Sequence, residues 1–212
     1  MSEEPEIRTR WSDMSGGIDA AQAYQRRFDD LAASGADVHG EARLVAALQP
    51  APARILDAGC GTGRVATQLT TLGYTCVGVD ADRHMIEVAS ERDPATLFVR
   101  GDLSTLALRT QAFDLALMAG NVVPLLAPGT LPATLARIAA HLQPLGLLVA
   151  GFGLDAEHLP GGCPITTLAD YERAAAAADL ALVAHWSTWD RAPRPQNSAD
   201  EGGYVVAVHR KQ

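Results

Sequence analysis

The feature that most constrains the fold is an alternation of short apolar runs with longer amphipathic segments along the middle of the chain. The apolar runs lie at residues 53–59, 75–81, 96–102, 113–121 and 145–153. Segments with apolar residues every three or four positions lie at 64–73, 83–93 and 130–142. Strands buried on both faces are nearly continuous apolar runs, and the helices between them make right-handed crossovers. We therefore expect a doubly wound α/β fold with a parallel sheet.

The pattern changes after residue 167. A helix is expected from Thr167, which is spaced from Asp170 as in a capping box, and it leads into a strand at about 180–190. A polar loop and a last strand at 202–210 follow, with no room for a crossover helix. The last two strands should therefore pair antiparallel as a hairpin, which completes a mostly parallel sheet of seven strands.

The composition limits the class of partner. The chain has 212 residues and a net charge of -8, which opposes a nucleic acid partner and suits a small molecule better. Cys60, Cys76 and Cys163 fit neither a disulfide framework nor a zinc site, and the histidines show no ligand spacing, so we expect no metal. With no signal peptide or membrane span in the sequence, we expect a cytoplasmic protein.

The stretch ILDAGCGTGR, Ile55 to Arg64, places three glycines directly after the first apolar run. A glycine-rich turn between a strand and a helix indicates a nucleotide or nucleoside site. Arg64 stands where the dinucleotide fingerprint needs its third glycine, and no lysine follows as in a phosphate-binding loop. The pattern therefore disfavours a pyrophosphate.

Carboxylates accompany the expected strand ends. Asp57 precedes the glycines, Asp80 ends the second strand, and Asp102 follows the third. An acidic residue in the position of Asp80 accepts the hydroxyls of a ribose. Asp102 lies along the same edge, where it can accept the exocyclic amine of an adenine.

Four segments in order, LDAGCGTG, VGVDAD, GDL and FDLALMAGN, resemble the motifs of the class I methyltransferases that use S-adenosylmethionine. The resemblance runs from about Arg54 to Phe152 and implies a Rossmann-like fold with S-adenosylmethionine as the methyl donor. It implies these positions: Asp57, Gly59 and Gly61 at the methionine end, Asp80 at the ribose, Asp102 and Leu103 at the adenine, and Ala119 to Asn121 beside the sulfonium and amino group.

The acceptor side is less defined by the sequence. Helices expected at 17–34 and about 39–48 precede the first strand. We expect residues 1–50 to form a helical segment that caps the site, and residues 51–212 to form the binding domain of one globular unit. The loops at 151–166 and 191–203 can also roof it. Asn121, His39 and Tyr24 are the candidates for a catalytic group, although a strand-end cap, a helix N-terminus and simple packing explain them as well.

The predicted function is methyl transfer to a small molecule by in-line displacement, with a general base needed only for a protonated nucleophile. Asn121 is followed by Val122, Val123 and Pro124, which departs from the NPPY-type motif of methyltransferases that act on adenine or glutamine. Two alternatives stay open: a non-catalytic module that binds S-adenosylmethionine or another nucleoside, and an NAD-linked oxidoreductase. The acceptor atom and the oligomeric state are not predicted.

Overall fold

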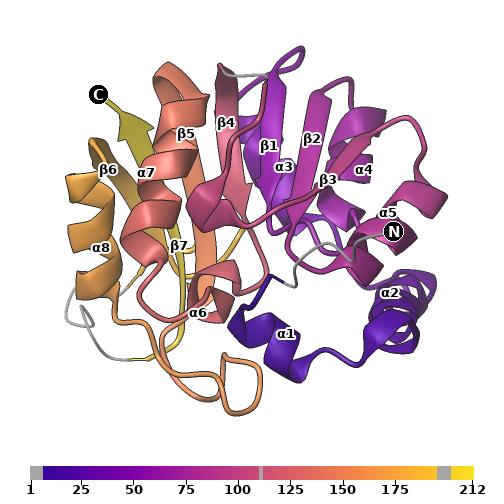
Figure 1. Ribbon diagram of the computed structural model, residues 1–212. Coiled ribbons are helices and arrows are strands. Elements are labelled where there is room, and N and C mark those ends of the chain that lie inside the picture. Colours follow the sequence, from indigo (N-terminus) through magenta and orange to yellow (C-terminus); the bar gives the residue numbers. More distant parts are fainter. Residues whose placement is uncertain (1–6, 110–111, 195–201) are drawn as a thin grey trace.

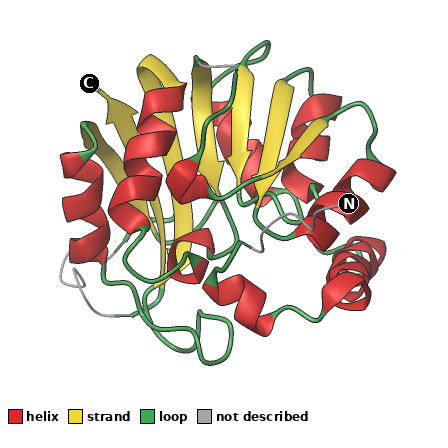
Figure 2. Ribbon diagram, in the orientation of Figure 1, coloured by secondary structure: helices red, strands yellow, loops and turns green. Residues whose placement is uncertain are grey.

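A seven-stranded sheet runs through the protein, and helices cover both of its faces (Figures 1 and 2). The computed structural model describes residues 7–109, 112–194 and 202–212. The strand order is β3-β2-β1-β4-β5-β7-β6, and the strands are β1 (Arg54–Ala58), β2 (Thr75–Asp80), β3 (Leu97–Arg100), β4 (Phe113–Met118), β5 (Leu142–Gly153), β6 (Leu180–Trp186) and β7 (Tyr204–Lys211).

The helices divide between the two faces of the sheet and its lower edge in Figure 1. They are α1 (Arg10–Met14), α2 (Gly17–Ala33), α3 (Gly40–Leu48), α4 (Arg64–Thr71), α5 (Arg83–Arg92), α6 (Val122–Leu125), α7 (Leu131–His141) and α8 (Leu168–Ala177), with a 3₁₀ turn η1 at Leu103–Thr105. The face with α7 and α8 is opposite that with α3 and α4.

Successive side chains of a strand point to opposite faces, so each central strand serves two cores. Ile55 of β1 and Leu115 of β4 pack in the core with α3 and α4, while their neighbours Leu56 and Ala116 pack in the core with α7 and α8. All four side chains are fully buried. This two-sided burial explains why the central strands are continuous apolar runs in the sequence.

The predicted fold class is confirmed. Strands β1 to β5 are parallel, β7 is antiparallel to both β5 and β6, and the helices lie close to their predicted ranges. β5 begins three residues earlier than expected, at Leu142, where a single pairing with Phe113 precedes a shift of register. β6 ends at Trp186 rather than near 190, because the chain turns back and the Ser187 amide donates to the carbonyl of Ala192, 2.9 Å away.

The C-terminal strands are fastened to α8 through one carboxylate. Glu172 of α8 accepts from Nε2 of His185 on β6 at 2.7 Å and from Nε2 of His209 on β7 at 2.9 Å. Burial raises the pKa of Glu172, but the two hydrogen bonds outweigh it and lower that pKa to about 2. The carboxylate therefore links three elements at the side of the sheet away from β3.

The parallel strands bring their carboxyl ends to one edge, at the bottom of Figure 1, where α1, α2 and α6 lie. The strand order reverses between β1 and β4, and open α/β sheets bind their ligands at such a switch point. The helices α1 and α2 reach this edge by packing on α5, through Trp11, Tyr24 and Met85. No helix in the described part of the chain is long and apolar enough to cross a bilayer.

Candidate functional site

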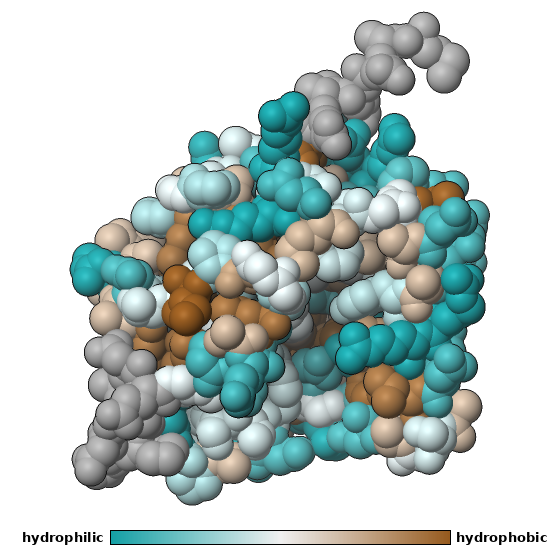
Figure 3. All heavy atoms as spheres, turned by 90° about the horizontal axis from the view of Figure 1, so that it is seen from below, coloured by the Kyte–Doolittle hydropathy of each residue, from teal (hydrophilic) through white to brown (hydrophobic). Residues whose placement is uncertain are grey.

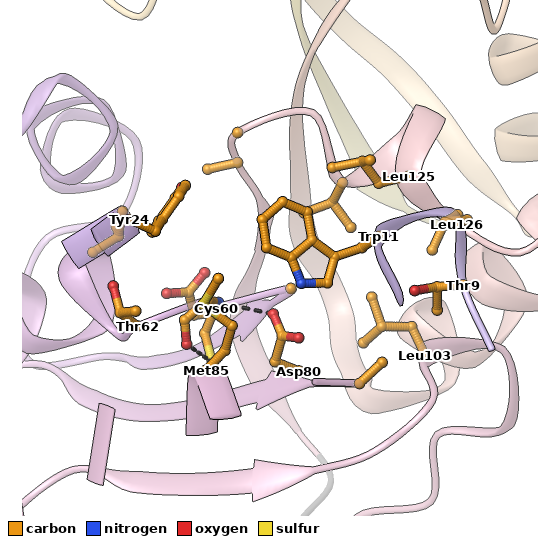
Figure 4. Close-up of a pocket in the computed structure, with 18 of the residues that line it drawn as sticks. Thr9, Trp11, Tyr24, Cys60, Thr62, Asp80, Met85, Leu103, Leu125 and Leu126 are labelled. Atoms are coloured by element: carbon orange, nitrogen blue, oxygen red, sulfur yellow. Dashed lines mark hydrogen bonds between the residues drawn. The ribbon is translucent and has the colours of Figure 1, made fainter. Parts of the chain in front are cut away.

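A cavity opens at the carboxyl ends of β1, β2 and β4 (Figure 4). Its floor contains seven of the predicted cofactor residues: Asp57, Gly59, Gly61, Asp80, Asp102, Leu103 and Ala119. Its roof comes from α1, α2, the end of α6 with the segment after it, and the loop after β5, through Trp11, Tyr24, Leu125, Leu126, Ala127 and Pro160. The fold therefore gathers residues from most of the chain around one space.

Two of the three glycines in the turn are required by close packing. Gly59 has a φ of 84° and faces Val122 of α6, so a Cβ there would collide with the valine side chain. Gly63 is the left-handed N-cap of α4, with a φ of 79°, and a Cβ there would lie 2.6 Å from the ring of Phe98. The bare backbone allows α4 and α6 to approach the strands.

The backbone donors of this turn are directed inward. The amides of Gly59 and Cys60 donate to the carbonyl of Val79 at 2.7 and 3.0 Å, and the amide of Gly61 donates to Asp80 Oδ2 at 2.8 Å. A pyrophosphate binds to free N–H groups at a helix N-terminus. This turn instead offers the cavity its neighbouring carboxylates.

Asp57 lies almost wholly inside the protein, with 2% of its surface exposed. Its Oδ2 accepts from the amide of Ala66 at 3.2 Å, in the first turn of α4, where Gly63 supplies no side-chain cap. Burial raises the pKa of Asp57 to about 7, and Arg64 and the hydrogen bond from Ala66 only partly oppose this. The carboxylate is therefore poised to ionise when a cation enters the cavity.

Asp80 ends β2 on the same floor. Its Oδ1 accepts from the amide of Asp82 at 2.9 Å, and its Oδ2 holds Gly61. Burial raises the pKa of Asp80 to about 6, against the opposing effect of these hydrogen bonds. Farther along the edge, Asp102 accepts from the amide of Ser104 at 2.8 Å and begins η1.

Arg64, the first residue of α4, holds the N-terminal helices in place. Its guanidinium donates to Glu41 of α3 at 2.6 Å and to the carbonyl of Val38, and it lies 4.6 Å from the ring centre of Phe28 on α2. Glu41 lies in the first turn of α3, and its pair with Arg64 was not predicted from the sequence. The arginine at the position of the missing third glycine was the available signal.

The three candidates for a catalytic group have separate surroundings. Tyr24 lines the cavity, and burial raises the pKa of its hydroxyl. His39 precedes α3 and lines a different crevice, between α2, α4 and the segment before α3. Asn121 is outside the cavity lining: its Oδ1 accepts from the amide of Gly153 at 2.7 Å, and its Nδ2 donates to the carbonyl of His158 at 3.1 Å.

The short helix α1 is part of the roof that the sequence did not predict. Its N-cap is a capping box of Thr9 and Ser12. Arg10 donates to the carbonyls of Pro124 and Leu126 at 3.0 and 3.2 Å, and Trp11 Nε1 donates to Asp82 Oδ2 at 2.9 Å. The helix is therefore fastened on both sides of the cavity. Residues 195–201 of the predicted roof loop lie outside the described residues.

Comparison with known proteins identifies the family. Residues 55–146 match the family described as "Methyltransferase domain". The crystal structure of a TehB-like, S-adenosylmethionine-dependent methyltransferase from Corynebacterium glutamicum is 36% identical, with a TM-score of 0.80, over 91% of this chain and 98% of that one. The chain belongs to the class I S-adenosylmethionine-dependent methyltransferases. The methyl donor of this family is S-adenosylmethionine, as the motifs implied.

Other relatives of this methyltransferase are larger or more distant. A dTDP-3-amino-3,6-dideoxy-α-D-glucopyranose N,N-dimethyltransferase from Streptomyces fradiae is 32% identical over 54% of this chain and 47% of its own length. The chain spans about half the length of the curated relatives it matches first. A SAM-bound amino pentose methyltransferase from Micromonospora echinaspora, 22% identical over 88% of this chain and 96% of its own, shares the fold with a TM-score of 0.64.

The cavity fits the family's cofactor. S-adenosylmethionine carries an ammonium and a sulfonium, and two carboxylates with raised pKa values, the buried Asp57 and the partly buried Asp80, line the cavity. Three successive amides of the glycine turn, from Gly59 to Gly61, already donate to Val79 and Asp80 and are not available to a pyrophosphate. In the described part of the chain no group of three or more His, Cys, Asp or Glu residues has a geometry that would hold a metal.

Proposed function

We propose that this chain transfers a methyl group from S-adenosylmethionine to a small-molecule acceptor by in-line displacement. The observation that supports it most is the juxtaposition of Asp57 and Asp80 in one cavity, beside a glycine turn in which three successive amides, from Gly59 to Gly61, already donate within the protein. A cationic amino-acid tail suits such a site, whereas a dinucleotide does not. Together with family membership, this favours methyl transfer over the NAD-linked oxidoreductase.

Each floor residue has a proposed role. Asp57, Gly59 and Gly61 hold the methionine end, where the Asp57 carboxylate accepts from the ammonium. Asp80 accepts from the ribose hydroxyls, and Asp102 with Leu103 holds the adenine. Ala119 lies nearest the reacting end. Bound S-adenosylmethionine supplies a methyl group on a sulfonium, which is already an activated leaving group, so the protein's main tasks are positioning and exclusion of water.

Residues 1–50 cap the site in this proposal. The described part of that segment supplies Trp11 and Tyr24 to the roof, and Arg10 ties it to the end of α6. Asn121 contributes indirectly, because its two hydrogen bonds fix the start of the loop that carries Pro160 into the roof. We assign it a positioning role in place of a direct contact with the cofactor.

The acceptor is proposed to be a small molecule and not a nucleic acid. The net charge of -8 would repel a polyanion. The Streptomyces fradiae relative is named for a nucleotide-linked amino sugar, which shows that this family includes enzymes for small acceptors. We further propose that the protein acts in the cytoplasm.

Calorimetric titration with S-adenosylmethionine, S-adenosylhomocysteine and NAD tests the proposal. We expect both S-adenosyl compounds to bind and NAD not to bind. Asp80→Ala should weaken S-adenosylmethionine binding by about 1.5–3 kcal/mol, the value of hydrogen bonds to a charged group, while the exposed control Asp30→Ala should not. Unchanged affinity in Asp80→Ala would remove the ribose assignment.

A labelled-methyl assay with fractionated small-molecule extracts separates catalysis from simple binding. We expect transfer of label to at least one extract fraction. Tight binding without label transfer to any fraction would instead favour a non-catalytic binding module. Preferential binding of NAD would favour the oxidoreductase.

A further inference from the structure

The cavity has two unlike walls. The floor carries the carboxylates of Asp57, Asp80 and Asp102, at the edge of the sheet. The roof is built from the side chains of Trp11, Leu125, Leu126, Ala127 and Pro160, which come from three separate parts of the chain. Because the ammonium, the ribose hydroxyls and the adenine of the cofactor are all assigned to floor residues in the proposed function, the apolar roof is available to the acceptor.

Trp11 is the central side chain of this roof. Figure 4 shows its indole in the middle of the cavity, with Leu125 and Leu126 on one side and Tyr24 on the other. The rings of Trp11 and Tyr24 meet edge to face, with centroids 6.1 Å apart. Apolar side chains also reach the surface near the middle of the same end of the molecule, seen from below in Figure 3.

The orientation of the indole is fixed by its polar edge. Nε1 donates to Asp82 Oδ2 at 2.9 Å, and Asp82 is itself held as the N-cap of α5 by the amide of His84 at 2.8 Å. Arg10, the preceding residue, anchors α1 to the carbonyls of Pro124 and Leu126 at the end of α6. The indole therefore presents its carbon face to the cavity and has its hydrogen-bonding group already engaged.

We propose that the acceptor is a small, flat, apolar molecule that packs on the indole face of Trp11. This inference rests on the proposed function, because it names the acceptor of that same site. Rigid aromatic surfaces recognise flat apolar partners through buried area and offset or edge-to-face ring contacts. Trp11 is the specificity-determining residue, and Tyr24, Leu125 and Leu126 complete the wall.

A nucleotide-linked sugar is the competing class of acceptor, as in the Streptomyces fradiae relative. Its diphosphate needs cationic side chains. Within the described lining of the cavity the cationic side chain is Arg64, which is 15% exposed and bonded to Glu41 at 2.6 Å. That guanidinium is committed to holding α3, so the observed lining favours the flat apolar acceptor.

The test is calorimetry on the protein saturated with S-adenosylhomocysteine, using three probes. 2-Naphthol is flat and apolar, 2-decalol is its saturated and puckered counterpart, and dTDP-glucose is a nucleotide-linked sugar. We expect 2-naphthol to bind at least about tenfold more tightly than either of the others, since ring contacts and flat burial together amount to about that factor.

Two variants of Trp11 and one control assign the effect to the indole. Trp11→Leu should weaken 2-naphthol binding by about tenfold, whereas Trp11→Phe should keep most of it because a ring remains. Trp186→Leu is the matched control, since Trp186 lies on β6 outside the cavity lining, and it should change nothing. S-adenosylhomocysteine affinity, measured for each variant, reports whether the cofactor floor is intact.

Each result decides between the hypotheses. Tighter binding of dTDP-glucose than of 2-naphthol, or failure of all three probes on a protein that binds S-adenosylhomocysteine, overturns the acceptor class and leaves the proposed function standing. An unchanged 2-naphthol affinity in Trp11→Leu overturns the role of Trp11. Failure to bind S-adenosylhomocysteine overturns the proposed function together with this inference.

Discussion

Ionisation of Asp57 should control how S-adenosylmethionine binding depends on pH. The pKa of Asp57 is raised to about 7 and that of Asp80 to about 6, in both cases chiefly by burial. A cation binds to the ionised carboxylates, so affinity should fall as pH drops through this range. Above pH 7 both groups are mostly ionised and their contribution should level off.

The size of the effect follows from the two pKa values. A group of pKa 7 is ionised in roughly 3% of molecules at pH 5.5 and in roughly 90% at pH 8. Because the cation binds to ionised Asp57, this residue alone should make the affinity roughly 30-fold lower at pH 5.5 than at pH 8. Asp80 adds roughly a further fourfold by the same calculation. At pH 6.5 the two carboxyls together hold roughly one proton, which binding should release.

Calorimetry in buffers of different ionisation enthalpy measures both quantities. Asp57→Asn is the matched control, because its amide oxygen can still accept from Ala66 and cap α4. In this variant the number of protons released on binding at pH 6.5 should fall to roughly a quarter, which is the part due to Asp80. The dependence of the affinity on pH should become weaker to the same extent. Equal affinity of the wild-type chain at pH 5.5 and 8, with no proton released at pH 6.5, would refute the reasoning.

Three further predictions concern stability, measured by urea unfolding. Gly63→Ala should lower the free energy of unfolding by about 2–4 kcal/mol, through left-handed strain and the clash with Phe98. Gly73 has a φ of 89° and open space around it, so Gly73→Ala should cost about 1–2 kcal/mol from strain alone. Equal losses in the two variants would contradict the packing argument. Glu41→Gln should lower the free energy of unfolding by about 2–3 kcal/mol, because it leaves the largely buried Arg64 guanidinium without its carboxylate. A loss below about 0.5 kcal/mol would argue against the pair as an anchor of α3. The pKa of Glu172 is lowered from 4.5 to about 2, so its ionised form stabilises the fold fully above about pH 4.5, and this stability is lost as pH falls toward 2. The difference in stability between Glu172→Gln and wild type should therefore be less than about half as large at pH 3 as at pH 6.

The order of strands and helices could be predicted because each central strand is buried on both sides and each crossover helix has a regular apolar face. The position of β7 could not, since pairing two strands as a hairpin does not say which one borders β5. Helices α1 and α6 have five and four residues, too few for periodicity to show.

The site was predicted where chemistry and strand ends coincide and missed where it depends on contacts distant in sequence. The floor residues Asp57, Asp80 and Asp102 follow from parallel strands that end at one edge. The bond between Trp11 and Asp82 joins segments 71 residues apart, which no local pattern indicates. Asn121 is a second example, because its left-handed φ of 68° and its bonds to Gly153 at the end of β5 and to His158 in the following loop depend on a register that only the folded sheet defines.

The insertion of β7 between β5 and β6 has a consequence for synthesis on the ribosome. β6 leaves the ribosome before β7, yet β7 is its hydrogen-bonded neighbour in the sheet and also the link to β5. Until residues 204–211 emerge, the nascent chain carries β5 with one open edge and β6 with nothing to pair with in the sheet. Open strand edges on incomplete domains are sites of misassociation, so this interval is when the chain should depend most on holding chaperones.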